Sequence, residues 1–220
     1  MKTGFIGLGA MGIPMARNLA KAGLLQGVWN RSPDKAQTLA AELGCTAYAT
    51  AADLAAHCEA IVLCVAADAD VRAVVDAIAG SVARATLVID CSTVSADTAR
   101  HAAKALAARG AQFLDCPVSG GVEGAKNATL AIMCGGEPAD FEAAKPILDA
   151  MGKTVRWFGP HGAGQSTKAT NQIMCAGIIR AVGEAAWSRE PWADLAAFAY
   201  DLKDWNTCYF AAKSGLAVAR

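Results

Sequence analysis

The sequence has no excess of charge of either sign. Its 220 residues include 20 Lys and Arg and 20 Asp and Glu, which gives a formal net charge of zero. No run of basic residues supplies the positive patch that nucleic acid or an anionic membrane surface requires. We therefore expect neither nucleic acid nor a membrane as a partner.

Long apolar runs are also absent, although 54% of the residues are hydrophobic. No stretch approaches the roughly 18 residues that a membrane helix needs, and the apolar segment after Met1 and Lys2 is too short for a signal peptide. The composition thus predicts a soluble, cytoplasmic protein that can bury one substantial core.

Cysteine pairs at CxxC spacing are missing, even though the chain has eight cysteines. The cysteines are widely spaced, and the three histidines do not lie near them at the spacing of metal ligands. Mostly buried, reduced thiols are therefore expected, and no metal site.

Residues 1–162 alternate short apolar runs with longer, alanine-rich stretches, which is typical of an α/β domain whose mostly parallel sheet is covered by helices. Strands are expected at 3–8, 27–30, 60–65, 86–91, 112–116, 130–134 and 154–158. Helices are expected at 11–22, 34–43, 69–79, 96–109 and 138–150. Residues 163–220 form a separate, all-helical region in this interpretation, because 166–187 can be one helix with no strand after it and a second helical pattern follows Pro191.

A glycine-rich loop, "GLGAMG", links the first expected strand to the first helix at residues 7–12. In the Rossmann dinucleotide fold, Gly7 would allow the tight turn, Gly9 would let the backbone approach a pyrophosphate, and Gly12 would permit close contact between helix and strand. The alternative is a glycine turn without a ligand. The strand-loop-helix context favours a Rossmann-type site, whose cofactor contacts would be Gly7, Leu8, Gly9, Ala10, Met11 and Gly12.

The end of the second strand indicates which dinucleotide binds. An NAD site commonly has Asp or Glu here for the adenine ribose, whereas this chain has Asn30, Arg31 and Ser32. A guanidinium suits a 2′-phosphate, and the two neutral side chains add hydrogen bonds without repelling it. NADP(H) is therefore the preferred cofactor, with NAD(H) possible, and the alternative is a solvated arginine at a strand end.

Two further stretches could carry chemistry. Ser119, Gly120 and Gly121 follow a strand end and could offer a hydroxyl and backbone N–H groups to an anion such as a carboxylate. Lys168, Asn171 and Gln172 lie at i, i+3 and i+4 in "GAGQSTKATNQ", so one helix face presents an ammonium and two amides. An ordinary turn and a solvated helix face are the respective alternatives.

Four motifs in order, "GLGAMG", "DCST", "DCPVSGG" and "GAGQSTKATNQ", make residues 1–186 resemble the β-hydroxyacid dehydrogenase family, which includes 3-hydroxyisobutyrate dehydrogenase and tartronate semialdehyde reductase. The resemblance implies hydride transfer between NADP(H) and a small 3-hydroxy acid or its semialdehyde. It implies that Ser119, Gly120 and Gly121 bind the substrate carboxylate, that Lys168 is the general acid/base and that Asn171 orients the substrate. It also implies cofactor contacts for Val65, Thr93 and Lys203.

The last part of the chain departs from the family pattern. "WSREPWADLAAFAY" does not follow it, whereas "LKDWNTCYFAAKSG" does so again, which an internal deletion, a frameshift or a fusion would each explain. A non-catalytic NADP-binding remnant of such an enzyme is therefore the alternative function. Half of the aromatic residues lie in this tail, and they could form a homodimer contact or a poorly packed surface.

Overall fold

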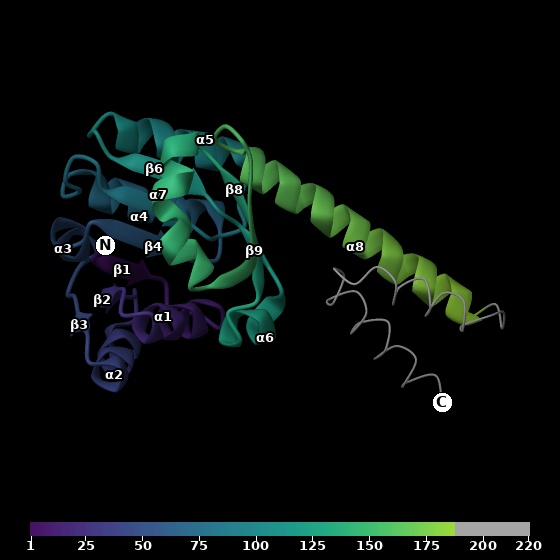
Figure 1. Ribbon diagram of the computed structural model, residues 1–220, viewed down its shortest axis with the longest axis horizontal. Coiled ribbons are helices and arrows are strands. Elements are labelled where there is room, and N and C mark those ends of the chain that lie inside the picture. Colours follow the sequence, from purple (N-terminus) through teal and green to yellow (C-terminus); the bar gives the residue numbers. More distant parts are fainter. Residues whose placement is uncertain (188–220) are drawn as a thin grey trace. The chain divides into compact units, whose positions relative to one another are not determined.

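The computed structural model describes residues 1–187 (Figure 1). The expected homodimer contact through the tail, and Lys203, lie outside the described residues. The chain divides into two units, Met1–Lys168 and Ala169–Arg220. The boundary expected from the sequence lies between residues 162 and 163, whereas the two units divide after Lys168. The first six residues of the last described helix, 163–168, therefore belong to the first unit.

The first unit alternates strands and helices along most of its length. Its strands are β1 (Thr3–Ile6), β2 (Leu25–Trp29), β3 (Thr46–Ala47), β4 (Ala60–Leu63), β5 (Leu87–Asp90), β6 (Gln112–Asp115), β7 (Val118–Ser119), β8 (Leu130–Gly135) and β9 (Gly152–Gly159). Its helices are α1 (Gly12–Lys21), α2 (Pro33–Leu43), α3 (Ala51–His57), α4 (Asp68–Ala79), α5 (Ala96–Ala107), α6 (Gly121–Lys126) and α7 (Pro138–Asp149). Helix α8 (Ala163–Trp187) begins in this unit and continues into the second.

The strands form one sheet in the order β3-β2-β1-β4-β5-β6-β8-β7, with β9 paired to β8. All neighbours are parallel except at β6–β8 and β7–β8, where the pairing is antiparallel. The chain moves outward from β1 to β2 and β3 and then returns to place β4 on the other side of β1. The mostly parallel, Rossmann-type sheet expected from the sequence is confirmed.

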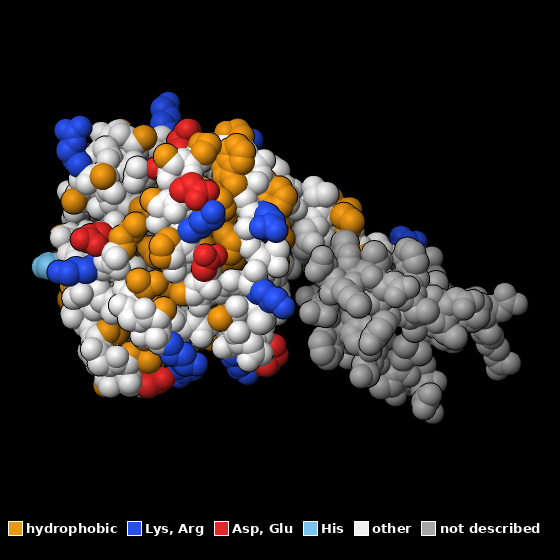
Figure 2. Space-filling model, in the orientation of Figure 1, with side chains coloured by type: hydrophobic (Ala, Val, Ile, Leu, Met, Phe, Trp, Pro, Cys, Tyr) orange, Lys and Arg blue, Asp and Glu red, His pale blue; other side chains and the backbone are white. Residues whose placement is uncertain are grey.

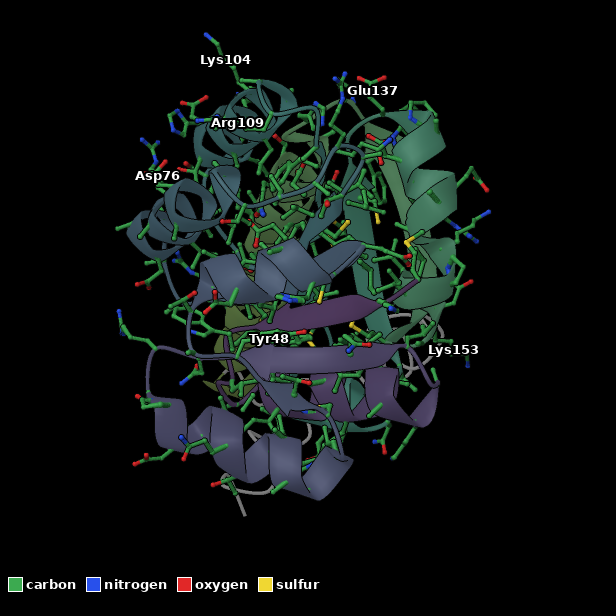
Figure 3. All side chains as sticks on the ribbon, turned by 90° about the vertical axis from the view of Figure 1, so that its left-hand side faces the viewer. Tyr48, Asp76, Lys104, Arg109, Glu137 and Lys153 are labelled. Carbon is green, nitrogen blue, oxygen red and sulfur yellow. The ribbon has the colours of Figure 1, made fainter. Side chains whose placement is uncertain are left out.

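Alternating strand residues feed two separate hydrophobic cores. Phe5 and Val62 pack into a core with α1, α2, α6 and α7, whereas Ile6 and Ile61 pack into a core with α3, α4 and α5. This period of two is expected for a sheet covered on both faces. Seen from the side, Asp76 and Lys104 mark α4 and α5 on one side of the sheet, and Glu137 marks the start of α7 on the other (Figure 3).

Several helix starts follow the local sequence. Pro33 occupies the first turn of α2, where its fixed φ suits a helix start, and the preceding Ser32 side chain makes no capping hydrogen bond. Ser95 caps α5, since its Oγ accepts a hydrogen bond from the N–H of Thr98. The sequence analysis missed α3, which Thr50 caps by accepting from the N–H of Asp53.

The described surface carries charges of both signs, and the described cysteines form no disulfides. On the face of the first unit seen in Figure 2, Lys and Arg side chains are interspersed with Asp and Glu. The seven cysteines in the described part of the chain are all free, and four of them are buried. Within residues 1–187, no helix is both long enough and apolar enough to cross a membrane.

Close backbone contact joins α8 to the sheet at Gly135. A Cβ atom added there would lie 2.6 Å from Oδ1 of Asp115 and 2.7 Å from the backbone N of Gly164. Neither neighbour is a flexible side-chain end that can move aside, because the Asp115 carboxylate is buried and hydrogen bonded. Only glycine therefore fits at this junction.

We expect Gly135→Ala to lower the free energy of unfolding by about 1–3 kcal/mol, since it overpacks this junction. The control is Gly80→Ala, because a Cβ at Gly80 meets nothing within 4 Å and its φ of −79° suits alanine. The control should change stability by less than about 0.5 kcal/mol. Equal urea denaturation midpoints for the two variants would contradict the packing argument.

Candidate functional site

A cavity of about 670 Å³ opens where the strand order reverses between β1 and β4. The carboxyl ends of β1, β2 and β4 meet there, which is the usual ligand crevice of an open parallel sheet. Its lining residues come from the glycine loop, from the β2–α2 connection and from the segment after β4. They include every residue of the glycine loop from Gly7 to Gly12, together with Asn30, Arg31, Ser32 and Val65.

The three loop glycines meet different surroundings. Gly7 has a φ of +97°, and a Cβ there would collide with the carbonyl oxygen of Cys64. A Cβ on Gly12 would collide with the carbonyl oxygen of Gly7, so both positions require glycine for packing. A Cβ on Gly9 meets nothing within 4 Å, so the backbone at Gly9 faces open space in the cavity. This arrangement fits a pyrophosphate lying against the loop and the start of α1.

Asn30 holds the glycine loop in place. Its Oδ1 accepts a hydrogen bond from the backbone N–H of Leu8 (2.9 Å), and its Nδ2 donates to the carbonyl of Ser32 (3.1 Å). The side chain thereby ties the end of β2 to the loop after β1. An aspartate would also accept from Leu8, but it would have no N–H group to donate to Ser32 and would add a negative charge.

Charged side chains line one part of the cavity. Arg31 has an 87% exposed side chain, and its Nη1 lies 3.3 Å from Oδ1 of Asp70 on α4. Lys35, on the first turn of α2, adds a second cation to the lining. The cavity lining therefore includes two cations and one carboxylate, of which the sequence analysis had named only Arg31.

Hydrogen bonds connect this cavity to the end of β5. The backbone N–H of Val65, which lines the cavity, donates to Oγ of Ser92 (2.9 Å). The N–H of Ser92 donates to Oδ1 of Asp90 (2.9 Å). Thr93 follows in the same loop with an exposed side chain, and it is not among the residues that line the cavity.

Asp90 is a fully buried carboxyl group at the end of β5. Its Oδ2 has no hydrogen-bond partner among the described residues. The pKa of Asp90 is raised to about 7, mainly by burial; the hydrogen bonds from Ser92 lower this pKa, and the charge of the nearby Asp115 raises it. The charged form of this group is therefore disfavoured in the fold.

Asp115, at the end of the neighbouring strand β6, caps helix α8. Its Oδ1 accepts from the N–H of Gly162 (2.7 Å), and its Oδ2 accepts from the N–H of Gln165 (2.9 Å). A carboxylate suits this position because the first N–H groups of a helix lack partners within the helix and carry partial positive charge. Burial raises the pKa of Asp115, and these hydrogen bonds counteract the rise.

Gln165 joins the same helix start to the loop after β5. Its Nε2 donates to the carbonyl of Ser92 (2.8 Å), and its Oε1 accepts from the N–H of Val94 (3.1 Å). The loop that contains Thr93 is thus held against the first turn of α8. Lys168 lies three residues after Gln165 on the same helix, and it is only 7% exposed.

The other predicted substrate contacts lie elsewhere in the described chain. Ser119 pairs with Ala131 of β8, and Gly120 and Gly121 have φ values of +132° and +61° at the start of α6. The Gly120 carbonyl accepts from the N–H of Gly124, which makes this segment a turn that opens a short helix. Asn171 lies in α8 within the second unit, one helical turn beyond Lys168.

Several polar residues of the site were missed in the sequence. Lys35 and Asp70 line the cavity, while Asp115 and Gln165 fix the start of α8. Asp115 and Gln165 stand inside motifs that the analysis quoted, so their position was a usable signal. Asp70 had no such signal, because its pairing with Arg31 joins residues 39 positions apart.

Comparison with known proteins supports a dinucleotide site. Residues 2–159 match the family described as the NAD binding domain of 6-phosphogluconate dehydrogenase. Over 183 residues the chain is 42% identical to a mitochondrial 3-hydroxyisobutyrate dehydrogenase of Drosophila melanogaster, covering 83% of this chain and 56% of that protein. Over 189 residues it is 39% identical to a 2-hydroxy-3-oxopropionate reductase of Escherichia coli, covering 84% of this chain and 64% of that protein.

A solved structure of a 3-hydroxyisobutyrate dehydrogenase is also similar to this chain. The 3-hydroxyisobutyrate dehydrogenase of Mycobacterium tuberculosis with L-serine superposes with a TM-score of 0.81 at 35% identity, covering 84% of this chain and 64% of that chain. The chain therefore spans somewhat more than half the length of the curated relatives it matches.

Asp90 should make stability depend on pH. Its pKa is about 7 in the fold against 3.8 normally, so the folded state binds a proton that the unfolded state releases between these values. The stabilisation from that proton is complete below about pH 4 and is lost as the pH rises through 7. We expect wild type to lose about 2 kcal/mol relative to Asp90→Asn between pH 5 and pH 8.

Urea denaturation of both proteins across this range provides the measurement. The exposed Asp76→Asn variant controls for the loss of one carboxylate and should track wild type (Figure 3). Parallel pH curves for wild type and Asp90→Asn would show that Asp90 does not titrate as described.

Proposed function

Because the chain belongs to the β-hydroxyacid dehydrogenase family, we propose that it transfers a hydride between NADP(H) and a small 3-hydroxy acid or its semialdehyde. One observation carries this proposal. Hydrogen bonds run from Val65 in the cavity through Ser92 to Gln165, and the buried Lys168 follows on the next turn of the same helix. A dinucleotide cavity and a buried amine are thereby linked within one unit.

The cofactor would lie in the cavity at the switch point. Its pyrophosphate fits the open backbone at Gly9 and the start of α1. Arg31 and Lys35 would face the 2′-phosphate, since both cations line the cavity near the end of β2. NADP(H) is the preferred form on this argument, although Asp70 also lies at this position.

The substrate would bind through its carboxylate to Ser119, Gly120 and Gly121. The Ser119 hydroxyl and the backbone N–H groups at the start of α6 are the donors in this proposal. Asn171 would orient the substrate from the next turn of α8 after Lys168. The names of the two curated relatives support a substrate of this kind, because the substrates in those names, 3-hydroxyisobutyrate and 2-hydroxy-3-oxopropionate, are small acids with a hydroxyl or oxo group.

Lys168 would move the proton of the reaction. When bound, the nicotinamide supplies or accepts the hydride. During reduction, Nζ of Lys168 would donate a proton to the carbonyl oxygen, and during oxidation it would take one from the hydroxyl. The low exposure of Lys168 keeps water away from this transfer, and the Asp115 cap and Gln165 fix the helix that carries it.

Arg31→Gln should weaken NADPH binding about 10- to 100-fold, because a charge-assisted contact with a phosphate is lost. NADH lacks that phosphate, so its dissociation constant should change less than about twofold. Arg109→Gln, at an exposed residue in the turn after α5, is the control (Figure 3). Fluorescence titration of wild type and both variants gives the six dissociation constants, and an equal loss for both cofactors in Arg31→Gln would contradict the assignment of Arg31.

Lys168→Gln should lower kcat by about two to four powers of ten and leave the NADPH dissociation constant within about twofold. Glutamine nearly matches the length of the side chain but cannot act as the acid or base. Lys104→Gln, on the exposed side of α5, should retain full activity.

The assay uses NADPH with a panel of short semialdehydes and the full chain. An unchanged kcat in Lys168→Gln would remove Lys168 from the mechanism. If wild type bound NADPH tightly but turned over none of the panel, the chain would instead be a nucleotide-binding module without catalysis.

A further inference from the structure

Arg31 and Asp70 form an ion pair inside the proposed cofactor cavity. Both residues line it, Arg31 from the connection after β2 and Asp70 from the first turn of α4. Nη1 of Arg31 lies 3.3 Å from Oδ1 of Asp70. The guanidinium that would face the phosphate is thus already partnered by a carboxylate of the chain itself.

The two acidic residues at the start of α4 have different partners. Oδ1 of Asp68 accepts from both the N–H (3.0 Å) and the Oγ (2.6 Å) of Ser95, so Asp68 fastens α4 to the start of α5. Asp70, in contrast, reaches across the cavity to Arg31. Either carboxylate would stabilise the helix start, so the helix alone does not account for the direction of Asp70.

We propose that Asp70 competes with the 2′-phosphate of the cofactor for Arg31 and thereby limits the preference of the chain for NADP(H) over NAD(H). This inference rests on the proposed binding of NADP(H) in this cavity. A phosphate that contacts Arg31 must displace the Asp70 carboxylate or lie close to it, and either costs binding energy. NAD(H) carries a hydroxyl at the same position, so the ion pair stays intact when it binds.

Asp70→Asn should therefore tighten NADPH binding about three- to tenfold, a range set by the modest strength of an exposed ion pair and of charge repulsion in water. The NADH dissociation constant should remain within about twofold. Asp76→Asn is the matched control, because Asp76 lies on the same helix, is exposed and does not line the cavity. It should leave both constants unchanged.

Two further measurements test whether the competition is for Arg31. The gain in Asp70→Asn should shrink when salt rises from about 0.05 M to about 0.5 M, because screening weakens interactions between exposed charges. In an Arg31→Gln background, Asp70→Asn should give a smaller gain, since no guanidinium is released.

Titration of the full chain with each cofactor decides between the outcomes. Equal changes for NADPH and NADH in Asp70→Asn, no change for either, or an undiminished gain in the Arg31→Gln background would overturn the inference. These results would leave the proposed function standing if wild-type binding of NADPH still depends on Arg31. Failure of wild type to bind either dinucleotide would instead refute the proposed function.

Discussion

The buried carboxylate of Asp115 is the constraint on which the rest of the site depends. It lies at the end of β6 and accepts two backbone hydrogen bonds from the start of α8. Those bonds fix where the helix begins, and Gly135 lets the helix approach the sheet closely enough to form them. The positions of Gln165 and Lys168 along α8 follow from this junction.

Burying carboxyl groups at this junction costs free energy, which the rest of the fold must offset. Asp90 and Asp115 are paired in register at the ends of adjacent parallel strands, and both are fully buried. Burial raises the pKa of each carboxyl group, and Asp115 also raises the pKa of Asp90. Two hydrophobic cores, one on each face of the sheet, supply the stabilisation that allows these groups to be retained. The polar groups are concentrated where the site is, which is the expected location of local departures from ideal packing.

The sequence predicted the parts of the fold that rest on regular patterns. Buried runs such as 60–63 and 87–89 were recognised as strands because they are apolar throughout, as parallel strands covered on both faces should be. Helix α6 was missed because "GVEGAK" has only six residues and two of them are glycine, which disfavours a helix. Helix α3 was missed because it has only seven residues, too few for a clear period of 3.6.

The site was predictable to the extent that it is local in sequence. The glycine loop and the segment Asn30–Arg31–Ser32 could be identified, and the structure places them around one cavity. The use of the Asn30 side chain to hold Leu8 and the pairing of Arg31 with Asp70 depend on contacts between distant segments. Such contacts cannot be predicted from charge and spacing along the chain, because they depend on how distant segments pack in the folded protein.

Hydrogen–deuterium exchange of the full chain with and without saturating NADPH tests the central claim most directly, namely that the cavity at the switch point holds the dinucleotide. The account predicts slower exchange in residues 7–12, 29–32 and 64–66, which line the cavity. It predicts no change in β9, which lies at the far part of the sheet beyond β8. Protection confined to β9 or to other segments remote from the cavity, or no protection at all, would contradict it.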